Sequence, residues 1–194
     1  MIGSEGPEVV VVRHGETDWS AVRRHTGRTD VALNEEGRLQ AARLAVPLAR
    51  RAFALVLTSP LERARETCAL AGFGSVAEVD DDLLEWDYGE YEGRTTADIR
   101  AERPRWSLWS DGAPGGEDSV AVGQRADRVV ARLRAASGDA LVFAHAHVLR
   151  VLAMRWIGLA AADGMRLQLE PTRLSVLGYE REVAVISEWN ATVA

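Results

Sequence analysis

A run of four valines near the start of the chain leads directly into an Arg-His-Gly turn. The valines occupy residues 9–12, and Arg13 and His14 follow them. A β-branched run of this kind predicts a central strand, and α/β folds bind their ligands at strand ends. The imidazole of His14 is therefore a candidate nucleophile, because a neutral imidazole can attack phosphorus and leave again. Arg13 would disfavour the imidazolium form and can bind a phosphoryl group through paired N–H donors.

Taken alone, His14 also fits a hydrogen-bonded structural histidine, so the assignment depends on other strand ends. An apolar segment at residues 53–58 runs into a predicted helix with Arg63 in its first turn. Helix N-termini attract anions because their backbone N–H groups are unpaired. A third apolar segment, at residues 141–144, ends at His145. These strand ends predict an anion site at one edge of a sheet.

The segment at residues 84–93 places four carboxylates among aromatic residues and glycines, as in an ordered loop over a site. A leaving alkoxide needs a proton, and Glu85 can donate one if its pKa is raised. Cover from Trp86 and Tyr88, together with a dianionic substrate, would raise that pKa. The ionised carboxylate would then serve as the base for water. The remaining carboxylates fit a solvated loop face; they are Asp87, Glu90 and Glu92.

Five motifs follow one another in a fixed order along almost the whole chain. They are Arg-His-Gly-Glu-Thr at residues 13–17, Thr-Gly-Arg-Thr-Asp at 26–30, Ser-Pro-x-x-Arg-Ala-x-x-Thr at 59–67, the acidic loop at 84–93 and a second histidine, His145. This ordered set resembles the histidine phosphatase superfamily, which includes cofactor-dependent phosphoglycerate mutases and many phosphomonoesterases. The resemblance implies a single domain over residues 1–194, in which about residues 85–117 form a lid-like insertion over the active site.

The resemblance also implies a role for each residue that matches a family motif. His14 is the phosphoryl acceptor and Glu85 is the proton donor. Arg13, Arg63 and His145 form the phosphate clamp. The chemistry of the residues agrees with these roles, because phosphoryl transfer requires charged oxygens to be held in line between nucleophile and leaving group.

Further substrate contacts implied by the resemblance are Ser20, Thr26, Gly27 and Tyr88. The chain departs from the family at Ala146, since most relatives have glycine after the second histidine. If the backbone N–H there contacts phosphate, a methyl group would crowd it or force a disfavoured backbone angle, because glycine tolerates positive φ better than alanine. We therefore include Ala146 in the substrate site, expect low activity, and expect Ala146→Gly to preserve or raise turnover.

The interval between Glu85 and His145 distinguishes branches of the family. Phosphoglycerate mutases carry a long basic insertion there, whereas this interval is short and contains no lysine. We therefore expect hydrolysis of a small phosphorylated metabolite, such as a sugar phosphate, through a phosphohistidine. Residues 85–93 and 106–112 and the His145-x-His147 pair resemble a phosphatase subgroup that contains actinobacterial acid phosphatases and fungal sedoheptulose-bisphosphate phosphatases. An acidic optimum would follow if Glu85 must be protonated.

Two other functions stay open at this point. One is phosphoryl transfer of the phosphoglycerate mutase type. The other is a regulatory module that binds phosphate esters with low turnover, for which Ala146 is the best support. The roles of Trp106 and Trp109 are also open, because they either wall the substrate entrance or pack the lid.

A metal site at the second histidine is a further alternative. As alternate residues of a strand, His145 and His147 would share one face, and with the acidic loop they would suggest zinc. No third ligand is evident, so we expect neither a metal nor another cofactor. His25 is expected at the surface.

Composition limits the class of protein. The chain has 194 residues, 47% of them hydrophobic, and a formal net charge of −6, which disfavours a general affinity for nucleic acid. Arg23 and Arg24 would add local positive charge near the site. A single cysteine, Cys68, fits a reducing compartment, and no signal peptide or membrane-spanning run is visible. We expect a cytoplasmic protein without membrane partners; the arginine-rich helices either serve a homodimer or are solvated.

The elements that position these residues alternate along the chain. Strands are predicted at residues 9–12, 53–58, 75–79 and 141–144, with a closing hairpin at 173–180 and 183–189. Helices are predicted from Asn34 to Leu48 and at 64–71, 95–103 and 117–136. The first of these helices is expected to face the core with Leu39, Ala42, Leu44, Ala45 and Leu48. Helices between strands imply right-handed crossovers and a mainly parallel sheet, and the hairpin adds an antiparallel edge. The expected fold is a three-layer α/β/α sandwich of the phosphoglycerate mutase type.

Overall fold

Six strands form one mixed sheet in the computed structural model, which describes residues 6–192. The strands lie in the order β3-β2-β4-β1-β5-β6. Their bounds are β1 Val9–Arg13, β2 Leu55–Thr58, β3 Glu78–Val79, β4 Ala140–Ala144, β5 Leu174–Glu180 and β6 Val183–Ala191. Strands β3, β2, β4 and β1 are parallel to one another, whereas β5 is antiparallel to both β1 and β6. The predicted mainly parallel sheet with an antiparallel edge is confirmed.

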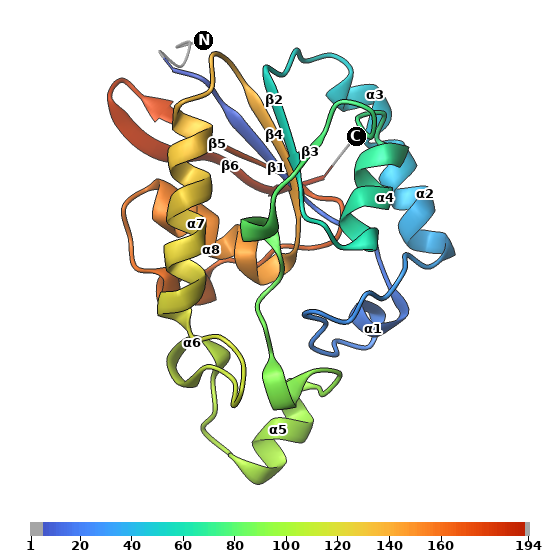
Figure 1. Cartoon of the computed structure of the whole chain (residues 1–194), viewed down its shortest axis with the longest axis vertical. Coiled ribbons are helices and arrows are strands. Elements are labelled where there is room, and N and C mark those ends of the chain that lie inside the picture. Colours follow the sequence, from blue (N-terminus) through green and yellow to red (C-terminus); the bar gives the residue numbers. More distant parts are fainter. Residues whose placement is uncertain (1–5, 193–194) are drawn as a thin grey trace.

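Helices cover both faces of this sheet (Figure 1). Alternate residues of a strand point to opposite faces, and the two hydrophobic clusters divide β1 accordingly. Val10 and Val12 pack in the cluster with α3 and α4, against which α2 lies, while Val9 and Val11 pack in the cluster with α7 and α8. The bounds of these helices are α2 Glu35–Arg43, α3 Ala45–Leu48, α4 Glu62–Leu70, α7 Ser119–Arg134 and α8 Ala146–Trp156. The three-layer α/β/α fold is therefore confirmed.

The predicted helix after Asn34 buries Leu44 and Leu48 as expected, but its first turns have a different inner face from the one expected. The side chain of Asn34 caps it by accepting a hydrogen bond from the Gly37 N–H at 2.8 Å. Leu39 is 52% exposed and Ala42 is also exposed, so their expected burial is wrong. The inner face begins instead with two small residues, Gly37 and Ala41. They face inward because the turn after β1 lies so close that a Cβ on Gly37 would overlap the backbone of Glu16.

A segment of short helices lies beyond the end of the sheet (Figure 1). It contains α5 Thr96–Glu102, α6 Leu108–Asp111 and the 3₁₀ turns η1 Asp81–Leu83 and η2 Gly89–Tyr91. Two further short elements, α1 Asp18–Ala21 and η3 Ala161–Arg166, are not part of this segment. Trp86, Tyr91, Trp106 and Trp109 are buried in the same cluster as α7 and α8. Trp106 and Trp109 therefore pack this segment into the core. Across residues 6–192, no helix has the length and apolar character needed to cross a membrane.

Candidate active site

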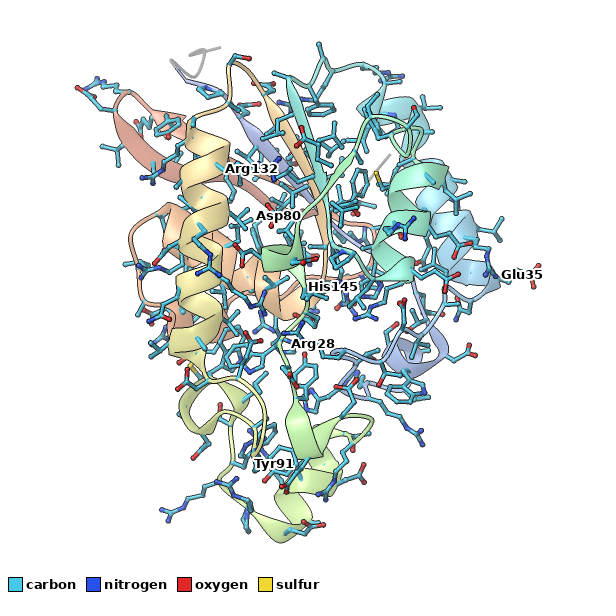
Figure 2. The ribbon with its side chains drawn as sticks, viewed as in Figure 1. Arg28, Glu35, Asp80, Tyr91, Arg132 and His145 are labelled. Atoms are coloured by element: carbon cyan, nitrogen blue, oxygen red, sulfur yellow. The ribbon has the colours of Figure 1, made fainter. Side chains whose placement is uncertain are left out.

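A cavity of about 770 Å³ opens where β1 and β4 end. Of the site residues predicted from the sequence, seven line it: Arg13, His14, Ser20, Thr26, Glu85, Tyr88 and Ala146. Three others lie behind that lining: Arg63 and His145, which have no exposed surface, and Gly27, which is buried. Figure 2 shows His145 at the end of the sheet nearest the segment that carries Tyr91. The structure thus gathers residues from distant parts of the sequence around one polar cavity.

The proton on the His14 ring is assigned by a backbone carbonyl. Nδ1 of His14 lies 2.7 Å from the carbonyl oxygen of Gly15. A carbonyl can only accept, so Nδ1 carries the hydrogen and Nε2 is free of it in the neutral ring. Burial lowers the pKa of His14 well below its usual value, and the charges of Arg63 and Arg13 lower it further. His14 is therefore held as a neutral imidazole with an unprotonated Nε2.

A second histidine stands beside the first, with its ring centroid 5.1 Å from that of His14. Nε of Arg63 donates to Nδ1 of His145 at 3.1 Å, so this nitrogen must be unprotonated. The hydrogen of His145 is then on Nε2, which lies 2.7 Å from the hydroxyl oxygen of Ser59. Burial and the charge of Arg63 lower the pKa of His145 well below its usual value. Sequence reasoning gave Ser59 no role, although it opens the 59–67 motif.

Arg63 also fixes the loop at residues 26–29. Its terminal nitrogens donate to the carbonyl oxygens of Thr26, Gly27 and Thr29 at 2.9 to 3.0 Å. The N–H of Gly27 donates to Glu92 at 2.8 Å, and a Cβ on Gly27 would lie 2.6 Å from the carbonyl oxygen of Trp86. Gly27 thus joins this loop to the acidic segment, while Thr26 lines the cavity.

Three backbone N–H groups hold the buried carboxylate of Glu85. Those of Trp86 and Val148 donate to Oε1 at 2.9 Å, and that of His147 donates to Oε2 at 3.0 Å. Burial by itself would raise the pKa of Glu85, but hydrogen bonding by His147 and the charges of His147 and His145 hold it well below its usual value. Cover by the aromatic residues therefore does not raise the pKa of Glu85 by itself, because backbone donors at the start of α8 replace the water lost on burial. The effect of a bound dianionic substrate on this pKa stays a prediction.

The other two histidines also line the cavity. Nδ1 of His147 lies 2.7 Å from the Tyr88 hydroxyl and 3.7 Å from Oε2 of Glu85. The ring centroid of His25 is 4.7 Å from that of Tyr88. Burial, and then the charge of His147, lowers the pKa of His25 to about 4. His25 is half-buried and not freely exposed as expected, because pairing of Arg24 with Thr95 brings this loop against the acidic segment.

The strand geometry behind the zinc hypothesis is also wrong. β4 ends at Ala144 and α8 begins at Ala146, so His145 precedes a helix and His147 lies within it. The two residues do not share a strand face. Among residues 6–192, no three His, Cys, Asp or Glu side chains are grouped as metal ligands.

The same architecture and motif order define a known family. The model of the histidine phosphatase superfamily (branch 1) matches residues 9–192. The chain belongs to the histidine phosphatase superfamily. It is 38% identical over 192 residues to an acid phosphatase of Mycobacterium tuberculosis, covering 95% of this chain and 94% of that one. It is 36% identical over 186 residues to sedoheptulose 1,7-bisphosphatase of Saccharomyces cerevisiae, covering 79% of this chain and 68% of the yeast protein.

Solved structures agree with this placement in the histidine phosphatases. The product of an open reading frame of Mycobacterium tuberculosis superposes with a TM-score of 0.92 at 37% identity, covering 97% of this chain and 99% of that one. Mycobacterial glucosyl-3-phosphoglycerate phosphatase complexed with VO3 gives a TM-score of 0.87 at 29% identity, covering 96% and 100%. The protein is therefore a phosphatase, and the expected family and enzyme class are confirmed.

The backbone of this histidine phosphatase is not strained at Ala146, the position where most relatives have glycine. Ala146 is the first residue of α8 and is absent from the residues with positive φ. The expected disfavoured backbone angle is therefore wrong, because a helical residue needs no glycine. The other expected effect, crowding of a bound phosphate by the methyl group, stays a prediction.

Sequence reasoning missed one arginine of this histidine phosphatase altogether. Arg150 lines the cavity from α8, and its guanidinium carbon lies 4.5 Å from the ring centroid of Trp109. Its Nε donates to the carbonyl oxygen of Gly164 at 3.0 Å. A predicted helix after His145 would have found it, because the helical period places Arg150 about one turn beyond His147. Arg23 and Arg24 line the cavity as well, in agreement with the basic pocket inferred from the sequence.

Proposed function

We propose that this phosphatase hydrolyses a phosphomonoester of a small metabolite through a phosphohistidine on His14. The observation that carries the proposal is the hydrogen bond from Nδ1 of His14 to the Gly15 carbonyl. It leaves Nε2 as the unprotonated nitrogen of a histidine that lines the cavity. A buried neutral imidazole is a competent nucleophile at pH values where an exposed histidine is largely protonated.

The phosphoryl group would be bound by Arg13, Arg63 and His145. Arg13 donates through Nη1 to the Leu169 carbonyl, and its buried Nε has no hydrogen-bond partner within residues 6–192. A buried guanidinium N–H is costly without an acceptor, so a phosphoryl oxygen is its natural partner. The Nε2 hydrogen of His145, which lies against Ser59, has a phosphoryl oxygen on the neighbouring His14 as an alternative acceptor.

Glu85 would move the proton in both steps. Binding of a dianionic phosphoryl group beside Glu85 raises its pKa, because two like charges disfavour ionisation. In the first step the bond between phosphorus and the ester oxygen breaks, the bond from Nε2 of His14 to phosphorus forms, and Glu85 gives its proton to the leaving oxygen. In the second step water attacks phosphorus, Glu85 takes the water proton, and the bond to Nε2 breaks to release phosphate.

The substrate would be a polar phosphate ester, with a sugar phosphate as the favoured class. Ser20, Thr26 and Tyr88 line the cavity beside the proposed phosphate site, and Arg23, Arg24 and Arg150 add positive charge around it. Relatives named for sedoheptulose 1,7-bisphosphate and for glucosyl-3-phosphoglycerate support this class. We further propose that the chain acts as one domain, with residues 85–117 covering the site.

The test is a panel of sugar phosphates, phosphoglycerates and p-nitrophenyl phosphate incubated with the purified protein in EDTA. Free phosphate and isomerised product are both measured, and His14→Ala is the control. Phosphate release is expected in EDTA, because every proposed step uses side chains of this chain. The release is expected to be lost in His14→Ala, because His14 is the proposed nucleophile. Isomerisation without release would make the protein a mutase. If neither free phosphate nor isomerised product forms, although the protein still binds phosphate esters, the regulatory module would be favoured.

A further inference from the structure

Arg125 of α7 binds both the backbone just before Glu85 and the partly buried carboxylate of Glu117. Its Nη1 donates to the carbonyl oxygens of Asp82 at 2.8 Å and Leu84 at 2.5 Å. Its Nε and Nη2 donate to the two carboxylate oxygens of Glu117 at 2.9 and 3.0 Å. Arg125 is only 6% exposed, so these hydrogen bonds are shielded from water. A planar guanidinium is the side chain that can serve this many acceptors at once.

Glu117 carries the connection to the other side of Glu85. Its Oε2 accepts from the backbone N–H of Asp87 at 2.9 Å, and its own N–H donates to the Asp87 carbonyl at 2.9 Å. Its carbonyl oxygen accepts from Nε1 of Trp86, also at 2.9 Å. The Arg125–Glu117 pair thus holds the backbone on both sides of Glu85, just before it and just after it.

Two further arginines of α7, Arg128 and Arg132, bind side chains near the start of the same segment and do not bind its backbone. Arg128 binds the side chain of Asp82, and Arg132 binds those of Asp80 and Glu78. Figure 2 shows Arg132 on α7 near Asp80. These pairs are more exposed than the Arg125–Glu117 pair, and they bind carboxylates with no bond to the loop backbone. Exposed pairs of this kind contribute little, so Arg128 is a suitable control for Arg125.

The need for such support follows from the chemistry of Glu85. Backbone donors of α8 hold its carboxylate when it is ionised. Once Glu85 is protonated, its oxygens are weaker acceptors and one of them carries the hydrogen to be donated, so this support weakens. The backbone contacts made by Arg125 and Glu117 do not depend on the charge of Glu85. They are therefore available in the protonated state that acid catalysis uses.

We propose that Arg125, acting with Glu117, is a positioning residue that keeps Glu85 aligned for proton donation to the leaving group. The proposal rests on the proposed function, in which Glu85 is the acid. Proton transfer tolerates little displacement, and a misplacement of about 1 Å can cost on the order of a hundredfold in rate. The contribution of Arg125 is thus expected in reactions whose leaving group requires a proton.

The test compares Arg125→Lys with Arg128→Gln on glycerol phosphate, which has a poor leaving group, and p-nitrophenyl phosphate, which needs little protonation. Lysine keeps the positive charge for Glu117 but cannot reproduce the fork that reaches both carbonyl groups. For Arg125→Lys, kcat on glycerol phosphate is expected to fall about tenfold or more, and kcat on p-nitrophenyl phosphate less than about threefold. Inhibition by inorganic phosphate should not change, and Arg128→Gln should behave as the unsubstituted protein on both substrates.

A double variant separates positioning from a general structural effect. In a Glu85→Gln background, Arg125→Lys should cause no further loss on glycerol phosphate, because the acid it positions is already gone. Equal losses on both substrates, weaker phosphate inhibition or a further loss in the double variant would overturn the proposal. Thermal unfolding checks that each variant is folded at the assay temperature, and Glu117→Gln replaces Arg125→Lys in the same comparison if the latter is not.

Failure of the proposed function would be seen separately. If Glu85→Gln with Arg125 intact slows both substrates equally, Glu85 is not the acid. If Glu85→Gln discriminates between the substrates and Arg125→Lys does not, only the positioning proposal fails.

Discussion

The backbone N–H of His147 donates to Oε2 of Glu85, and Nδ1 of the same histidine lies 3.7 Å from that oxygen. One residue thus supplies two groups that favour the ionised carboxylate. An acid needs the opposite state, so substrate must change the protonation of Glu85. A dianionic phosphoryl group in the cavity has the charge to do this.

Glu85→Gln is expected to slow alkyl phosphates far more than p-nitrophenyl phosphate. The amide cannot donate a proton as an acid does, and general acid catalysis is worth on the order of 10² to 10⁴ in rate. Steady-state kcat values on glycerol phosphate and p-nitrophenyl phosphate provide the measurement. Equal losses on the two substrates would remove Glu85 from the acid role.

His25 is expected to make the protein less stable in acid. Its pKa is about 4 in the folded chain against an ordinary 6.5. Between pH 6.5 and pH 4 the unfolded chain therefore binds a proton on His25 that the folded chain does not bind. This stabilisation is fully present above about pH 6.5 and is lost as the pH falls toward 4. Between pH 7 and pH 5 the unfolding free energy of the unsubstituted protein should fall by up to about 2 kcal/mol more than that of His25→Gln. Urea unfolding at both pH values tests this, and parallel losses in the two proteins would contradict it.

Gly37→Ala is expected to damage both stability and activity, although Gly37 does not line the cavity. A Cβ there would overlap the backbone of Glu16, two residues after His14. Relief requires movement of backbone, which costs about 1 to 3 kcal/mol and displaces the nucleophile. Urea unfolding and kcat on p-nitrophenyl phosphate measure the two effects. Gly123→Ala is the control, since its methyl would meet only the Cβ of Ala161 at 3.1 Å.

Ala146→Gly is expected to lower the unfolding free energy by up to about 1 kcal/mol without raising kcat. Ala146 begins α8 in helical conformation, where glycine loses more chain entropy on folding. Urea unfolding and kcat on p-nitrophenyl phosphate are the measurements. A rise in turnover of more than a few fold would show that the methyl group obstructs phosphate after all.

The sequence by itself was sufficient to predict the layers of the fold and to identify the family from its motifs. The valine run of β1 and the hairpin of β5 and β6 have the local apolar patterns from which strands are predicted. The helix α8 escaped prediction because its short apolar start reads equally well as the end of a strand. That ambiguity produced the mistaken strand face of His145 and His147 and concealed Arg150.

Only the tertiary structure decided the electrostatics of the site. The bond from Arg63 to His145 joins residues 82 positions apart, and no local pattern specifies which tautomer it selects. The pKa of Glu85 is lowered because backbone N–H groups of α8 bind its carboxylate. The pKa of His25 is lowered because its ring is buried against the acidic segment. Local periodicity reports which face of an element is apolar, whereas a pKa depends on charges and donors brought together from every element around the group. The sequence therefore determined which chemical groups are present, and tertiary packing determined their protonation and their supports.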